Sequence, residues 1–167
     1  MHEQSPPTAA PVDPRDLPGS FRHEIEVEVR FADTDAQGHV NNASYLTYCE
    51  IARIRYWTDV TGEAFAEATH GPESLILAEA RITYRAPAFY GDVVTVQTRA
   101  THIGRSSFTL EHRLVALAPG ELQRLVAVSG SILVRYDYAR ASSVTLSPTQ
   151  VAAMEAFEGK TLSVSVA

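Results

Sequence analysis

The segment SYLTYCEIARIRYWTDV at residues 44–60 contains no glycine or proline and places apolar side chains at helical spacing. Apolar residues cover most of the girth of the predicted helix, and a helix of this kind is usually buried in a core. The spacing therefore predicts one long central helix. Ser44 or Asn42 is a suitable N-terminal cap. Gly62 comes just past the end, where glycine commonly stops a helix.

The segments on either side of the helix alternate between apolar and polar residues, as half-buried β-strands do. The strand before the helix has the apolar face Ile25, Val27, Val29 and Phe31. Four alternating segments follow, at residues 79–86, 94–98, 107–114 and 126–136, and the last places Val126, Val128, Gly130, Ile132, Val134 and Tyr136 at alternate positions. Strands joined by short turns imply an antiparallel sheet, with the helix on one face. The expected fold class is α+β, with about five strands.

Both ends of the chain carry local signals. Residues 1–20 contain five prolines and few large apolar groups. Such a segment buries too little surface to offset its ordering entropy, so we expect a disordered tail. It also lacks the charged-then-apolar pattern of a signal peptide. Residues 147–157 are typical of a short helix, capped by Ser147 with Pro148 at its first position. We expect residues 21–167 to form a single domain.

The composition excludes several classes of function. The chain has 167 residues and a formal net charge of −6, with 14 basic against 20 acidic residues. It therefore has no electrostatic basis for wrapping nucleic acid. No apolar run approaches the roughly 20 residues that cross a bilayer. Cys49 is the only cysteine and cannot form an internal disulfide, which fits a reducing compartment. We expect a cytoplasmic protein with no membrane or nucleic-acid partner.

The polar segment between the first strand and the helix carries the chemistry. It has the sequence FADTDAQGHVNN at residues 31–42, in which Gly38 is expected to form a turn, and is followed by Tyr45, Glu50 and Arg53. This pattern resembles the 4-hydroxybenzoyl-CoA thioesterase family, and especially the branch whose bacterial members hydrolyse acyl-CoAs. Later motifs agree with the same family, namely YRAPA at residues 84–88, Gly91-Asp92, and IGRSSF at residues 103–108. The resemblance spans about residues 22–138.

The resemblance implies a hotdog fold, in which a curled antiparallel sheet wraps around one central helix. It also implies a homodimer or homotetramer with active sites at the dimer interface. The substrate would be an acyl-CoA, hydrolysed to a free acid and CoA. Asp35, the second aspartate of the D-x-D pattern, matches the family's catalytic carboxylate, which acts as nucleophile or as general base. No cofactor is implied, because CoA is part of the substrate, and no metal is implied.

Elementary chemistry agrees with these roles. Thioester hydrolysis requires an attacking oxygen, which a loop carboxylate can supply, and donors for the charge that develops on the carbonyl oxygen. The start of a helix offers free N–H groups and a positive dipole end, so the Asn42 amide is the candidate oxyanion donor. His39 is a candidate proton carrier or orienting group, and Asp33 is expected to hold the loop. The side chains of Asn41 and Asn42 are expected to cap the helix.

Three further predictions concern the helix and a later hairpin. Glu50 and Arg53 are expected to form an ion pair, with Glu50 as the alternative catalytic base. Cys49 is expected to fill the core, because nothing basic adjoins it in the sequence. By resemblance, the residues that would contact the CoA phosphates and pantetheine are Arg105, Ser106 and Ser107.

Two other functions compete with an acyl-CoA thioesterase. HVNN at residues 39–42 is also similar to plant acyl-ACP thioesterases, although those enzymes carry two hotdog repeats and an asparagine where this chain has Gln37. The other alternative is a non-catalytic hotdog module that binds acyl-CoA, but such a module has no need for a carboxylate beside the thioester. The chain has no G-x-S-x-G elbow, no dinucleotide fingerprint and no histidine pair at metal-ligand spacing.

Overall fold

The structure is a computed structural model that describes residues 21–64, 73–118 and 122–163. The expected tail at residues 1–20 lies outside the described residues. In chain order the elements are β1 (His23–Glu28), the short 3-10 helix η2 (Phe31–Asp33), α1 (Asn42–Thr61), β2 (Glu73–Tyr84), β3 (Val93–Ile103), β4 (Ser107–Leu117), β5 (Arg124–Asp137), β6 (Ser142–Ser143) and α3 (Pro148–Glu158).

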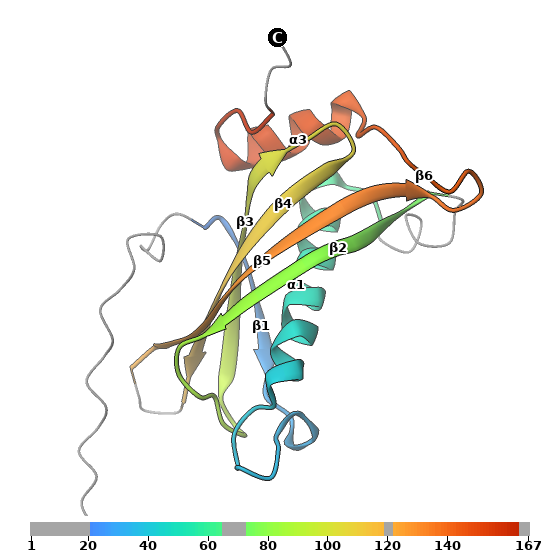
Figure 1. The fold of residues 1–167 in the computed structure, drawn as a ribbon. Helices are drawn as coiled ribbons and strands as arrows, with labels where there is room; N and C mark the ends of the chain where they lie inside the picture. The colour runs from blue at the N-terminus through green and yellow to red at the C-terminus, as the bar shows by residue number, and fades with distance from the viewer. Residues whose placement is uncertain (1–20, 65–72, 119–121, 164–167) are drawn as a thin grey trace, which may run out of the picture.

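The strands form one antiparallel sheet in the order β1-β3-β4-β5-β2, and β6 pairs with β5. The sheet curves along α1, which lies on one of its faces, and α3 lies at the end where β3 turns into β4 (Figure 1). The predicted antiparallel sheet and long helix are confirmed. The two-residue strand β6 was not predicted and brings the number of strands in the described residues to six. No described helix is long and apolar enough to cross a membrane.

Helix α1 begins two residues earlier than the apolar pattern indicated. Its N-cap is Asn41, whose side chain accepts a hydrogen bond from the Ala43 amide. The expectation that Asn41 caps the helix is confirmed, whereas the expectation that Ser44 or Asn42 does so is wrong. Gly62 ends the helix at φ 75°, a left-handed conformation that glycine adopts without steric cost.

Some expectations about burial are also wrong. Phe31 is 78% exposed, because β1 ends at Glu28 and the chain then turns into η2. In β5 the expected residue Val126 is buried, but the buried row after it lies between the expected residues and consists of Ala127, Ser129, Ser131 and Leu133. Helix α1 buries only part of its girth, since Leu46 and Ile51 remain 40% and 39% exposed.

The C-terminal helix α3 is fixed at both of its ends. Ser147 and Gln150 form a reciprocal capping box at its start, as the sequence predicted for Ser147. At the other end the buried carboxylate of Glu158 accepts hydrogen bonds from the Tyr56 hydroxyl at 2.8 Å and from the Ala100 amide at 2.7 Å. These two contacts join α3 to both α1 and β3.

The core consists of two apolar clusters along α1. The cluster at the N-terminal half of the helix is built on Tyr45, Tyr48, Cys49 and Ala52. The cluster at the C-terminal half is built on Tyr56 and Trp57, with Trp57 stacked on Phe108. Between them a buried polar row crosses four neighbouring strands, through the cross-strand partners His23, Thr98, His112 and Ser129.

His112 is the central member of the polar row. Its Nδ1 atom lies 3.0 Å from Thr98 Oγ1, and its Nε2 atom lies 3.4 Å from Ser131 Oγ. Burial lowers the pKa of the imidazole to about 3, and the nearby Arg53 guanidinium acts in the same direction. The ring is therefore neutral in the folded protein at physiological pH and is held by hydroxyl groups.

This neutrality predicts a pH dependence of stability. Below the ordinary histidine pKa of 6.5 the unfolded chain binds a proton that folded His112 does not bind until about pH 3. The free energy of unfolding should therefore fall with decreasing pH, by up to about 1.4 kcal/mol per pH unit from this residue. The free energy of unfolding, measured with urea between pH 7 and pH 4.5, should depend less steeply on pH in His112→Gln than in the wild type. The same change at exposed His102 should leave the slope unaltered, and parallel curves for wild type and His112→Gln would refute the assignment.

Candidate active site

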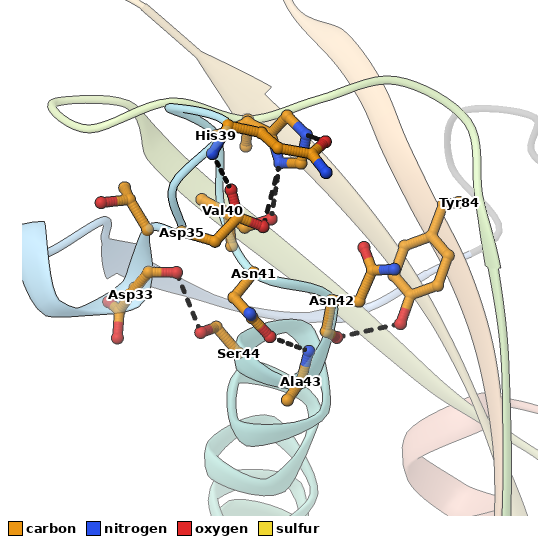
Figure 2. Close-up of polar contacts among 12 residues, drawn as sticks. Asp33, Asp35, His39, Val40, Asn41, Asn42, Ala43, Ser44 and Tyr84 are labelled. Carbon is orange, nitrogen blue, oxygen red and sulfur yellow. Dashed lines mark hydrogen bonds and ion pairs between the residues drawn. The ribbon is translucent and has the colours of Figure 1, made fainter.

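The loop between β1 and α1 folds back on itself above the start of the helix (Figure 2). Thr34 and Val40 form an isolated antiparallel bridge. Inside it, the Asp35 amide donates to the His39 carbonyl and the Gly38 amide donates to the Asp35 carbonyl, both at 3.0 Å. Gly38 has φ 82°, a left-handed conformation that suits glycine. The sequence signal for a turn at Gly38 is therefore confirmed.

Asp35 lies at the tip of this loop with its carboxylate half-buried. One carboxylate oxygen, Oδ1, accepts a hydrogen bond of 2.8 Å from the Gln37 amide. The other, Oδ2, lies 3.7 Å from His39 Nδ1. The far nitrogen of the same imidazole, Nε2, lies 3.0 Å from Gln37 Oε1. One oxygen of Asp35 is thus fixed by the backbone, and the other faces a histidine that Gln37 orients.

Asp33 holds the base of the loop. Its carboxylate accepts hydrogen bonds from the Arg30 guanidinium and the Tyr48 hydroxyl. Its carbonyl accepts from the Asn41 amide and from Ser44 Oγ. The hydrogen bond from Arg30 lowers the pKa of the Asp33 carboxyl below its ordinary value, against the opposing effect of burial. Both ends of this residue are fully engaged, so Asp33 positions the loop.

The start of α1 presents one amide that donates to no group in the part of the chain that the structure describes. The Ala43 amide donates to the Asn41 side chain and the Ser44 amide donates to the Asn41 carbonyl. The amide of Asn42 has no acceptor among the described residues. The Asn42 carbonyl accepts a hydrogen bond of 2.9 Å from the Tyr84 hydroxyl, which fixes the first turn against β2 (Figure 2).

Tyr84 is the site residue that sequence reasoning missed. It belongs to β2, and only the folded chain brings it to the helix start. Its ring also packs edge-on against Tyr45 at a centroid distance of 5.4 Å. The sole sequence signal was its place in the motif YRAPA, which gave no role for the hydroxyl group.

The predicted CoA-binding residues lie elsewhere in the chain's fold. Arg105 and Ser106 lie in the turn between β3 and β4, and Ser107 begins β4; the Gly104 amide donates to the Ser107 carbonyl. The Asp35 loop adjoins the opposite end of β3, because the Val29 amide donates to the Asp92 carbonyl. The 11 residues of β3 separate the two places by about 35 Å. A single protomer therefore does not bring Asp35 and the Arg105 turn together.

The other predictions on α1 can be compared directly with the geometry. Glu50 and Arg53 form the expected ion pair, at 3.5 Å. Cys49 is buried in the core, as expected, and burial raises the pKa of its thiol to about 11. The thiol is therefore not an activated nucleophile at neutral pH. Within the described ranges, no three histidine, cysteine, aspartate or glutamate residues are grouped so as to hold a metal ion.

The loop and the helix start together offer the parts of a hydrolytic site. Asp35 can accept a proton from water or attack a carbonyl carbon with Oδ2. The Asn42 amide, at the positive end of the α1 dipole, can donate to an oxygen that gains negative charge. Both features come from one segment of 12 residues, at positions 31–42.

Known proteins resemble this chain over most of the described fold. The family model described as Thioesterase-like superfamily matches residues 29–156. The crystal structure of a thioesterase from Thermus thermophilus, complexed with coenzyme A and Zn, is 31% identical with a TM-score of 0.73. That match covers 86% of this chain and 99% of the other.

Two curated relatives are similar over shorter stretches. A 1,4-dihydroxy-2-naphthoyl-CoA hydrolase of Synechococcus elongatus is 30% identical over 93 residues, which is 55% of this chain and 68% of that protein. A chloroplastic acyl-acyl carrier protein thioesterase of Arabidopsis thaliana is 29% identical over 95 residues. That match covers 57% of this chain and only 50% of the plant protein.

The role of Asp33 can be tested by Asp33→Asn. At pH 7 the change removes a charged acceptor from Arg30, and we expect a loss of about 1–3 kcal/mol in the free energy of unfolding. Because the pKa of Asp33 lies below its ordinary value of 3.8, this stabilisation is present above pH 3.8 and is lost as the pH falls through the lower folded-state pKa. The difference in urea unfolding midpoint between the wild type and Asp33→Asn should therefore become smaller at acidic pH. Exposed Glu28→Gln serves as control, and a pH-independent gap would contradict this explanation.

Proposed function

Because the chain belongs to the thioesterase-like superfamily and is a thioester hydrolase with the hotdog fold, we propose that its substrate is an acyl-CoA, cleaved by water into a free acid and CoA. The observation that carries this proposal is the loop at residues 31–41, which holds the Asp35 carboxylate above the unused Asn42 amide. The proposal includes a closer relation to the 4-hydroxybenzoyl-CoA thioesterases, which the motif FADTDAQGHVNN supports.

In this mechanism the thioester carbonyl oxygen lies against the Asn42 amide. The N–H group and the α1 dipole stabilise the negative charge that develops when the carbonyl carbon becomes tetrahedral. Removal of one oxyanion donor typically lowers the rate by about 100- to 1,000-fold. The hydrogen bond from the Tyr84 hydroxyl to the Asn42 carbonyl keeps this turn of the helix in place.

Asp35 supplies the attacking oxygen in one of two ways. As general base, Oδ2 takes a proton from water while the water oxygen bonds to the carbonyl carbon. As nucleophile, Oδ2 itself bonds to that carbon, and water hydrolyses the resulting anhydride. In both routes the C–S bond breaks with its electron pair on sulfur, and the proton released by water reaches the thiolate, with His39 beside Asp35 as its carrier. A single turnover in ¹⁸O-labelled water places the label in Asp35 only by the second route.

A complete site requires a second copy of the chain in this proposal. Strand β2 lies at the edge of the sheet among the described strands, and Leu77 on it is 42% exposed. If two copies pair antiparallel along β2, the Tyr84 end of one lies beside the Glu73 end of the other. Ile76, Val134 and Ser107 form one row across β2, β5 and β4. The loop of the partner copy would then lie three strand spacings, or about 15 Å, from the predicted CoA-binding turn.

An acyl-ACP substrate is the alternative within the same chemistry. The plant relative named an acyl-acyl carrier protein thioesterase supports it, although this chain spans only half the length of that protein. Free-thiol release from acetyl- through palmitoyl-CoA, benzoyl-CoA and the matching acyl-ACPs separates the two carriers. Binding of acyl-CoA without release of thiol would instead favour a non-catalytic module.

Asp35→Asn tests the central assignment. The asparagine keeps an acceptor for the Gln37 amide but has no basic or nucleophilic oxygen, so kcat should fall by about 100- to 10,000-fold. Thermal unfolding and oligomeric state should match those of the wild type. Glu26→Gln, which neutralises an exposed carboxylate on β1, is the matched control and should retain activity. If Asp35→Asn turned over substrate at the wild-type rate, Asp35 would not be the catalytic group, and Glu50 or His39 would be the next candidate.

The proposed dimer is tested by placing charge on the β2 edge. Leu77→Lys should give a monomer in analytical ultracentrifugation and should lose most thioesterase activity, because Asp35 and the CoA-binding turn would no longer share a site. Leu117→Lys is a matched control, since Leu117 is also 42% exposed but lies on β4. A wild type that is monomeric and active would overturn the shared site.

A further inference from the structure

One row of side chains runs along α1 from the proposed oxyanion donor into the core. Asn42, Leu46, Cys49 and Arg53 follow one another at spacings of four, three and four residues, so they share one face of the helix. This face is turned toward β2 and β5. Tyr84 of β2 reaches the Asn42 carbonyl, and Ser129 of β5 lies against the Cys49 thiol.

Along this row the side chains change from the polar Asn42, through the apolar Leu46 and Cys49, to the cationic Arg53. Leu46, four residues after Asn42, is 40% exposed although Tyr45 and Cys49 beside it on the helix are buried. On the facing strand β2, three residues that pair with buried residues of β5 keep part of their own surface exposed. The pairs are Ala80 with Ser131, Ile82 with Ser129, and Tyr84 with Ala127. The apolar surface beside the reaction centre is therefore only partly covered within the protomer.

Arg53 is a largely buried cation that the protein leaves poorly satisfied. Its side chain is 12% exposed, and its contact with Glu50 is long, at 3.5 Å, while Glu50 itself is 55% exposed. No hydrogen bond joins the guanidinium to another described residue. Burial lowers the pKa of Arg53. A guanidinium carries five N–H donors, and one long contact with an exposed carboxylate leaves most of them without a hydrogen bond to any described residue.

A second buried polar group lies beside Arg53. Ser129 Oγ has no hydrogen-bond partner among the described residues other than the weakly bonding Cys49 thiol. Arg53 lies one helical turn after Cys49 on α1, and Ser129 lies against the Cys49 thiol. Ser129 is also the cross-strand partner of His112, whose two ring nitrogens are already taken by Thr98 and Ser131. A buried hydroxyl without a strong partner, near a guanidinium that has only one long ion pair, is typical of a site that a ligand oxygen completes.

We propose that Arg53, with Ser129, binds an oxygen atom at the far end of the acyl group, and that the preferred substrates are acyl-CoAs of medium length ending in a hydroxyl or a carboxylate. This inference rests on the proposed function, which places the thioester carbonyl at Asn42. The Arg53 side chain points back toward Glu50, as helical side chains do. The rise from Asn42 to Glu50 is about 12 Å. A medium-length acyl chain spans this distance, and a benzoyl ring does not.

The test compares kcat/KM for decanoyl-CoA, 10-hydroxydecanoyl-CoA and the CoA monothioester of decanedioic acid, with the octanoyl and dodecanoyl series beside them. The wild type should prefer an oxygen-bearing chain by about tenfold or more, since a hydrogen bond to a charged group contributes about 1.5–3 kcal/mol. The better of the hydroxyl and carboxylate series identifies the group that Arg53 binds. The preference should be largest at the chain length whose end reaches Arg53.

The variants isolate the residues responsible. Arg53→Met should reduce the preference ratio by about 10- to 100-fold. Arg53→Lys should retain part of it, and Ser129→Ala should reduce it less than Arg53→Met. Arg55→Met, an exposed arginine on the other side of α1, should keep the wild-type ratio. Thermal unfolding verifies that each variant is folded. If Arg53→Met does not fold, Arg53→Lys and Ser129→Ala provide the test instead.

Two outcomes would overturn the inference. One is a wild type that hydrolyses the unsubstituted chain as well as its oxygen-bearing counterpart at every length. The other is an unchanged preference in Arg53→Met. Either result leaves the proposed function in place, because thiol is still released. The absence of thiol release from every thioester would instead contradict the proposed function itself.

Discussion

The hydrogen bonds of Asp33 are the constraint on which the candidate site depends. Its carboxylate joins η2 to α1 through Arg30 and Tyr48, while its carbonyl receives the Asn41 amide and the Ser44 hydroxyl. A single residue thus fixes the loop and the first turn of the helix relative to each other. Because the Tyr48 hydroxyl lies in the core, a shift of the loop would also unpair a buried polar group. The geometry around Asp35 follows from this framework.

The same framework gives the backbone groups at the start of α1 different hydrogen-bond partners. Asn41 occupies the amides of Ala43 and Ser44, which leaves the Asn42 amide available to a substrate. The Asn42 carbonyl is held by Tyr84, a residue of the edge strand β2. The first turn of α1, which holds the proposed oxyanion donor, is therefore connected to the strand along which a second copy of the chain would pair. Any rearrangement of that edge would be transmitted to the oxyanion site by one hydrogen bond.

The sequence predicted the elements well and the tertiary relations poorly. Helical spacing and alternation are local properties, so the long helix, the antiparallel strands, the Asn41 cap and the turn at Gly38 were all accessible. The buried row of β5 was not, because small residues and serines face α1 there while larger apolar residues face outward. The contact of Tyr84 with the helix start and the burial of Arg53 depend on strands distant in the sequence. The separation of Asp35 from the Arg105 turn became visible only with the strand order.

The polar row through His23, Thr98, His112 and Ser129 divides the core into two apolar clusters that share few side-chain contacts. Free-energy changes at distant sites without common partners usually add, whereas those of neighbours do not. Substitutions around Trp57 and those around Tyr48 should therefore combine additively. The end of the molecule that holds the Asp35 loop and the end that holds α3 can accumulate changes independently. A hydrolase divided in this way can diverge in one half during evolution while the chemistry in the other half is conserved.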